Sequence, residues 1–237
     1  MTAASTYLKD DFTGPVPARR RPASTSRAWA AVGVAAAASA IVGIGASMAS
    51  DAVYAESAQG NPAAIVDRLS DQVPQLLVFH VATMVAALLV LVFGAGLRRR
   101  LEAQAPAGSL LPAVAAAGMA LVSVAGLLGT GLDTEFVFGV SDPEAKLVPE
   151  AAVVFGHWVG TIPWLWVGAG VTAVAVAVAA LRHAAAPRWL GWFSAVLGVI
   201  TLGFGISPLQ YMAGMTGPVW LLVASLGFFL GDRSARR

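Results

Sequence analysis

The sequence predicts an all-α integral membrane protein with six transmembrane helices and both termini in the cytoplasm. Hydrophobic residues make up 57% of the 237 residues and charged residues only 12%, which is about half the charged fraction of an ordinary soluble protein. The apolar residues occur in six blocks that are long enough to cross a hydrocarbon core of roughly 30 Å. These blocks lack the alternation of β-barrel strands, and a lipid-exposed backbone must satisfy its own hydrogen bonds, so helices are expected.

The apolar blocks set the expected boundaries of the helices, which are residues 28–50, 74–97, 109–132, 151–181, 188–207 and 212–231. The segment before them, residues 1–27, combines Gly, Pro, Ser and Thr with several arginines, a composition typical of a disordered basic tail. Residues 232–237 form a second cytoplasmic tail. We therefore predict a single transmembrane domain over residues 28–231.

Basic residues are distributed unequally between the two sides of this domain. With the N-terminus inside, only Arg68 and Lys146 of the 15 basic residues lie in outer loops. Cytoplasmic loops of membrane proteins carry such an excess of Lys and Arg, so the orientation follows. The two longer loops, 51–73 and 133–150, are acidic and are expected outside. The Ala-, Gly-, Val- and Arg-rich composition suggests a bacterial inner membrane.

The first outer loop contains the signal for a short helix. Asn61 can cap its N-terminus, and Pro62 suits its first turn. We expect this helix to lie along the outer surface.

A weak internal repeat relates two parts of the chain. Val73-Pro74 is followed by Phe79-His80, and Val148-Pro149 by Phe155-Gly156-His157; each copy then ends in a Leu-Gly-x-Gly sequence. Both copies start and end outside, so they would be parallel repeats. A true duplication would make the second to fifth helices a four-helix core, with the first and last helices beside it.

His80 and His157 are the candidate functional residues. Each follows a helix-starting proline by six to eight residues, roughly 9–12 Å along the helix, so we expect the two imidazoles at similar depth. Ionisable groups inside a membrane are functional candidates by default. Two histidines on facing helices can supply both axial ligands of a haem iron, which makes haem b one hypothesis.

A metal site is the second hypothesis for these histidines. Imidazole and carboxylate donors suit several transition metals, and His80 and His157 could be joined by Asp133 and Glu135. The third interpretation is structural, with each histidine bonded to a backbone carbonyl or a hydroxyl.

The fourth apolar block is unusual because Pro163 interrupts it, and a proline bends a membrane helix. Gly156 and Gly160 form a small-xxx-small pair that lets another helix approach closely. Residues of this region are candidates for a pocket or kink, with ordinary bundle packing as the alternative: Glu150, Gly156, Gly160, Thr161, Pro163 and Trp164.

Several chemistries are excluded by what the sequence lacks. It contains no cysteine, hence no disulfide or thiolate metal site. It contains no Gly-x-Ser-x-Gly, His-Glu-x-x-His or phosphate-loop motif. No Asp, Glu, Lys or Arg falls at the middle of a predicted helix, which argues against a proton-coupled transporter.

The sequence therefore favours a non-enzymatic membrane protein, either an accessory subunit, a sensor or a ligand-binding protein. Two alternatives stay open, namely a haem or metal redox protein using His80 and His157, and a small-solute transporter or channel. The lipid bilayer is the expected partner, nucleic acid is not, and other membrane subunits or self-association remain open.

Overall fold

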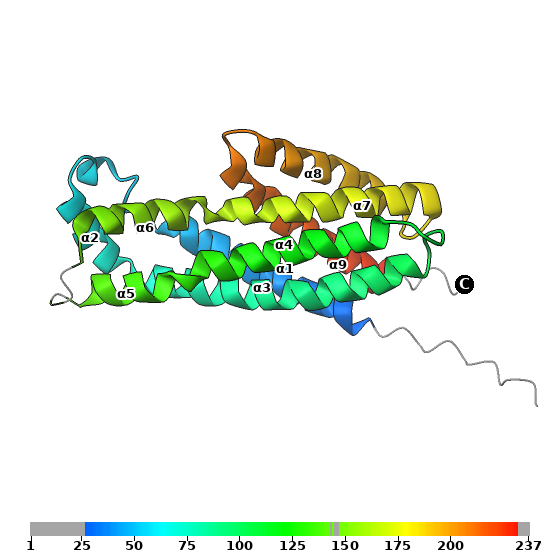
Figure 1. The fold of residues 1–237 in the computed structure, drawn as a ribbon, viewed down its shortest axis with the longest axis horizontal. Helices are drawn as coiled ribbons and strands as arrows, with labels where there is room; N and C mark the ends of the chain where they lie inside the picture. Colours follow the sequence, from blue (N-terminus) through cyan, green and yellow to red (C-terminus); the bar gives the residue numbers. More distant parts are fainter. Residues whose placement is uncertain (1–26, 143, 145–146, 232–237) are drawn as a thin grey trace, which may run out of the picture.

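A computed structural model of the chain describes residues 27–142, 144 and 147–231, and these residues form helices and connecting turns without a strand. Figure 1 shows an elongated bundle whose helices run roughly along one axis. The predicted tails, 1–27 apart from Arg27 and 232–237, lie outside the described residues.

Six helical segments are long and apolar enough to cross a membrane, which confirms the predicted number and indicates a multi-pass membrane protein. They are α1 (Ala28–Ala49), α3 (Val73–Glu102), α4 (Leu111–Gly131) with α5 (Asp133–Ser141), α6 (Pro149–Thr161) with η2 (Ile162–Trp166) and α7 (Val167–His183), α8 (Arg188–Ile206), and η3 (Gln210–Met212) with α9 (Ala213–Gly231). Arginines mark one end of the bundle, the arginine-rich end, which holds Arg27, Arg98, Arg99, Arg100, Arg182 and Arg188.

The opposite end, called here the acidic end, is more helical than predicted. Helix α3 has 30 residues, roughly 45 Å, so it is longer than a hydrocarbon core of about 30 Å. Helix α4 continues into α5 after Leu132, so the predicted loop 133–150 was wrong for residues 133–141. Asp133 consequently lies within a helical rod and is buried.

The short helix predicted after Asn61 is confirmed as α2 (Pro62–Asp71), which follows η1 (Glu56–Ala58). The Asn61 side chain accepts a hydrogen bond from the amide of Ala64 at 3.2 Å, as an N-cap residue should. Helix α2 buries Ile65 and Leu69 and packs against α5 and α6, so it belongs to the acidic end of the bundle.

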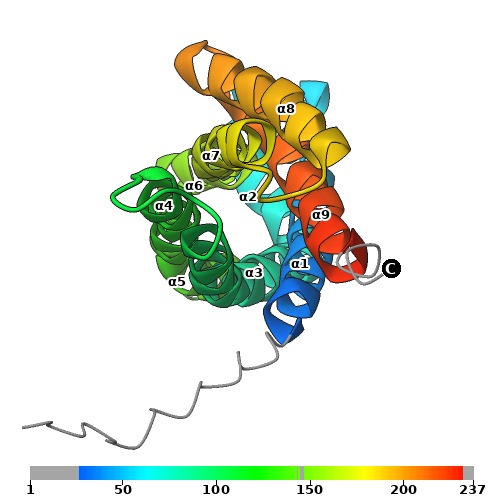
Figure 2. The same ribbon diagram turned by 90° about the vertical axis from the view of Figure 1, so that its right-hand side faces the viewer.

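The predicted four-helix core was wrong in its membership. Seen end-on, α1, α3, α4, α7 and α9 form a ring, and α8 lies outside it against α7 and α9 (Figure 2). Helix α1 joins the ring because its buried face consists almost entirely of Ala and Gly, which lets α3 and α9 approach closely. The internal repeat remains a prediction.

Small and hydroxyl side chains hold neighbouring helices together. At the α4–α7 crossing, a Cβ on Gly118 would lie 2.5 Å from the carbonyl oxygen of Gly168, so only glycine fits. Beside it, the Thr172 hydroxyl donates to the carbonyl of Ala115 at 2.9 Å. Helix α8 is attached through hydroxyl groups as well, because Thr201 donates to Thr216 at 2.7 Å.

At Pro163 the fourth span changes from α6 to the 3₁₀ segment η2, so its α-helix is interrupted there, while the predicted bend stays a prediction. Proline has no N–H, so the carbonyl of Val159, four residues earlier, loses its helical partner. The buried Ser47 hydroxyl of α1 donates to that carbonyl at 2.8 Å. At the same junction, the Thr161 hydroxyl donates to the carbonyl of His157 at 2.8 Å, a side-chain bond that competes with regular helical hydrogen bonding.

This arrangement predicts that Ser47→Ala destabilises the protein by about 1–3 kcal/mol, because it leaves a buried carbonyl without a donor. Thermal unfolding in a fixed detergent measures the effect. Pro163→Ala restores an N–H that can bond Val159, so Ser47→Ala should cost less in a Pro163→Ala background. An equal cost in both backgrounds would contradict the link between the two residues.

Candidate functional site

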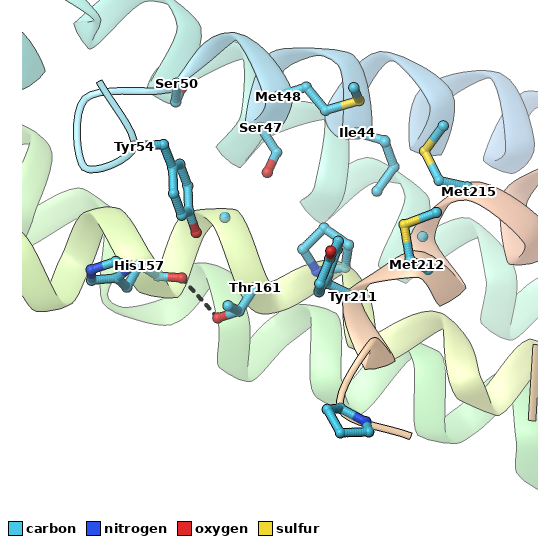
Figure 3. A pocket seen from close by; sticks show the side chains of 14 residues that line it. Ile44, Ser47, Met48, Ser50, Tyr54, His157, Thr161, Tyr211, Met212 and Met215 are labelled. Carbon is cyan, nitrogen blue, oxygen red and sulfur yellow. Dashed lines mark hydrogen bonds between the residues drawn. The ribbon is translucent and has the colours of Figure 1, made fainter. Parts of the chain in front are cut away.

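A cavity lies beside Pro163, between the end of α1, the α6–η2 junction and the start of α9 (Figure 3). Its volume is about 750 Å³. Its lining contains no charged residue and comes from three parts of the chain: Ile44, Ser47, Met48, Ser50 and Tyr54; His157, Gly160, Thr161 and Pro163; and Pro208, Tyr211, Met212, Gly214 and Met215. We call this cavity the tyrosine pocket.

One wall of the tyrosine pocket is the turn that follows α1. Gly156 and Gly160 make room for it, because a Cβ at either position would collide with Val53 or with the Tyr54 hydroxyl, respectively. The predicted close approach at this glycine pair is thus present. Its partner is a turn, whereas the sequence suggested another helix.

An ionic network ties this turn to α2 and α3. The Arg68 guanidinium donates to both carboxylate oxygens of Asp51 at 3.2 Å. The Gln72 amide donates to Asp51 at 2.6 Å, and its oxygen accepts from the amide of Ala52 at 3.2 Å. The network fixes the backbone on which Tyr54 stands.

The polar groups of the pocket lie on two of its sides. The rings of Tyr54 and His157 meet edge to face, with centroids 5.5 Å apart. In Figure 3 the Tyr54 hydroxyl points into the pocket, and Tyr211 stands on its far side near Met212. Partial burial raises the pKa of the Tyr54 hydroxyl above its ordinary value of 10.0, with a smaller effect from Tyr211, so Tyr54 is a neutral donor at physiological pH.

Most hydroxyl groups of the pocket already donate hydrogen bonds to backbone carbonyls. Ser47, Ser50 and Thr161 donate to the carbonyls of Val159, Ala46 and His157, respectively. Within the described part of the chain, no such bond is recorded for the Tyr54 hydroxyl, the Tyr211 hydroxyl or the His157 imidazole. These three groups are the ones free to bond a ligand.

A second polar feature lies between α3 and α5, where His80 faces Asp133. The His80 Nδ1 atom is 3.6 Å from Asp133 Oδ2, and the Asp133 side chain is only 1% exposed. Neither Asp133 carboxylate oxygen accepts a hydrogen bond from a described residue. A buried carboxylate without hydrogen bonds is costly, so a cation or a proton at this position stabilises it, and His80 is placed to supply either.

The two histidines therefore have different neighbours. His80 faces Asp133, whereas His157 stands against Tyr54 in the tyrosine pocket, which does not include His80. This arrangement does not support the bis-histidine haem hypothesis. Among the described residues, no group of three or more His, Cys, Asp or Glu is placed to hold a metal ion.

Three other residues that the sequence suggested for a metal site or pocket lie outside the tyrosine pocket. Glu135 is exposed on α5, and Glu150 is exposed in the first turn of α6. Trp164 lines a different cavity, of about 390 Å³, together with Trp158. Trp158 holds α6 to α4, because its indole donates to the carbonyl of Gly129 at 2.8 Å.

Sequence reasoning missed Tyr54, Tyr211 and Ser47 as pocket residues. Tyr54 and Tyr211 are two of only three tyrosines in the chain, and both fall just beyond the end of an apolar block. That placement was a usable signal for an outer aromatic site. Ser47 gave no signal, because its role depends on a carbonyl 112 residues away.

No protein-family model matches the chain, and neither the curated proteins nor the solved structures contain a match. The geometry of these sites is therefore the basis for the proposals below.

Acid should weaken the turn that carries Tyr54. The Gln72 hydrogen bond, aided by Arg68, lowers the pKa of Asp51 below its ordinary 3.8. A lowered folded-state pKa means that the stabilisation is complete above 3.8 and is lost as the pH falls below it. Thermal unfolding from neutral pH to below 3.8 should show a smaller acid-induced loss in Asp51→Asn than in the parent. The exposed Asp67→Asn is the control and should behave as the parent does.

Removing His80 should leave the buried Asp133 carboxyl group without its imidazole neighbour. We expect His80→Ala to destabilise the protein by about 2–3 kcal/mol. The double variant His80→Ala/Asp133→Asn should recover much of that loss, since the amide needs no counter-charge. Unfolding curves in one detergent test this, and a double variant no more stable than His80→Ala would refute the pairing.

Proposed function

We propose that this chain is a non-enzymatic, ligand-binding membrane protein whose tyrosine pocket takes a neutral, lipophilic molecule bearing hydrogen-bond acceptors. The observation that carries the proposal is the combination of a cavity of about 750 Å³ with an uncharged lining and three uncommitted polar groups. Ligand sites commonly have volumes of about 300–1,000 Å³, apolar walls and a few convergent polar groups.

The lining selects the class of ligand. The pocket lining contains no Asp, Glu, Lys or Arg to act as a counter-charge, which disfavours a charged ligand. Met48, Met212 and Met215 supply flexible apolar surface that adapts to irregular shapes. Tyr54 and Tyr211 can donate to carbonyl or ether oxygens, so a molecule with an apolar body and two acceptors fits best.

The rim of the pocket favours entry from the membrane. Met48 and Met215 are 67% and 48% exposed, respectively, and stand in the last turn of α1 and the first turn of α9. We place the protein in the bacterial inner membrane with both termini cytoplasmic, as the arginine distribution supports. The pocket then opens toward the outer leaflet, where lipophilic molecules concentrate.

A short-chain prenylated benzoquinone is a suitable probe, because it is neutral and lipophilic and carries carbonyl acceptors. Its binding to the full-length protein in nanodiscs can be followed by quenching of tryptophan fluorescence. Tyr54→Phe and Tyr211→Phe each remove one donor while keeping the ring. Each should weaken binding by about fivefold to tenfold, the value of one hydrogen bond.

A blocking variant tests the location of binding. Met215→Trp adds bulk at the rim of the pocket and should abolish quenching by blocking entry, whereas Val199→Trp, on an exposed position of α8, should leave binding intact. Equal binding by Met215→Trp and the parent would exclude the tyrosine pocket as the site.

A further inference from the structure

A second polar cavity lies at the arginine-rich end of the bundle, far along the axis from the tyrosine pocket. It is small, about 50 Å³, and forms where the start of α1 meets the ends of α3 and α9. Its lining combines arginines with aromatic and small residues: Arg27, Trp29, Gly96, Arg99, Arg100, Ala103 and Phe228. We call it the arginine cavity.

Aromatic packing fixes the three helix ends around this cavity. The Trp29 ring lies between Phe93 of α3 and Phe228 of α9, with centroid distances of 5.6 and 5.4 Å. Gly96 admits the tryptophan, because a Cβ at that position would collide with the Trp29 side chain. The cavity is therefore part of a packed junction, and its shape does not depend on surface loops.

One of its arginines is held in place by the backbone. The Arg27 guanidinium donates through Nη1 to the carbonyl of Phe229 at 3.1 Å, which bridges the start of α1 to the end of α9. Arg99 stands in the last turn of α3 and is exposed. The planar guanidinium presents donors in a fork that matches the oxygens of a phosphate.

The described lining of the cavity is basic. Its described lining includes no acid, and the nearby Glu102 is already paired with Arg98 at 2.8 Å. Arg27 and Arg99 bring two like charges to this small space, so an anion between them is favourable.

The position in the membrane indicates which anion. Tryptophan and a cluster of arginines at the end of an apolar helix mark the level of the lipid headgroups. Basic pockets between transmembrane helices at this level bind the headgroups of anionic lipids. The cavity is too small for a whole lipid, so only the phosphate would enter it, with the acyl chains along the outside of the bundle.

We propose that the arginine cavity binds the phosphate of an anionic phospholipid, with Arg27 and Arg99 as its principal donors. This site is separate from the tyrosine pocket and does not depend on the function proposed for that pocket. Bound lipid would tie α1, α3 and α9 together at one end of the ring.

The test uses the full-length protein in a mild detergent, with dioleoyl-phosphatidylglycerol, dioleoyl-phosphatidylcholine or inorganic phosphate added in separate titrations. Thermal unfolding reports binding, since a ligand of the folded state raises the unfolding temperature. Native mass spectrometry counts the lipids retained. We expect phosphatidylglycerol to raise the unfolding temperature and to be retained, and the other two additives to have little effect.

Matched charge-removing variants locate the site. Arg99→Gln should weaken phosphatidylglycerol binding at least tenfold. Arg99→Lys keeps the charge but loses the forked guanidinium, so its affinity should lie between those of the parent and Arg99→Gln. Arg188→Gln removes an exposed arginine at the same end of the bundle and should bind as the parent does. If Arg27→Gln is too unstable to purify, the two Arg99 variants decide alone, because that side chain is exposed.

Three results would overturn the proposal. An equal loss in Arg188→Gln would mean diffuse surface charge, and equal stabilisation by phosphatidylcholine would mean no preference for anionic lipid. A shift produced by inorganic phosphate as large as that by phosphatidylglycerol would identify a free-phosphate site.

Discussion

The structure depends on how one backbone carbonyl is satisfied. Pro163 removes the donor that Val159 would have used, and in a membrane protein water is not freely available to replace it. Ser47 of α1 supplies the hydrogen bond. The interruption of the fourth span at Pro163 therefore also determines where the end of α1 packs. The turn after α1 then runs over Gly156 and Gly160. The walls of the tyrosine pocket follow from this contact.

The ends of the bundle differ in chemistry and in construction. At the acidic end, helices extend beyond the thickness of a hydrocarbon core and the Asp51 network anchors a turn against them. At the arginine-rich end, aromatic rings pack three helix ends together around guanidinium groups. Between them the interior is mostly apolar, with a few buried hydroxyl groups such as those of Thr172 and Ser194. Charged side chains lie mainly at the two ends, as the cost of burying charge in an apolar interior requires.

The pair of His80 and Asp133 is the exception, because it places a buried carboxylate beside an imidazole without hydrogen bonds to either Asp133 oxygen. Its isolation from the tyrosine pocket separates the two histidines that looked equivalent in the sequence. They occupy comparable places in their helices, yet one faces α5 and the other faces the turn after α1. Similar spacing along two helices does not specify which neighbour each side chain meets.

Six apolar helices and the capped helix after Asn61 could be predicted from the sequence alone, because hydrophobic length and capping are local properties. The interruption of the helix at Pro163 and the room left by Gly156 and Gly160 were local as well. The place of α1 in the ring, the extension of α4 into α5, and the meeting of Tyr54, His157 and Tyr211 were decided only by the tertiary structure. These features depend on contacts between residues far apart in the chain, and nearly uniform Ala- and Val-rich helices carry little information about which faces pack together.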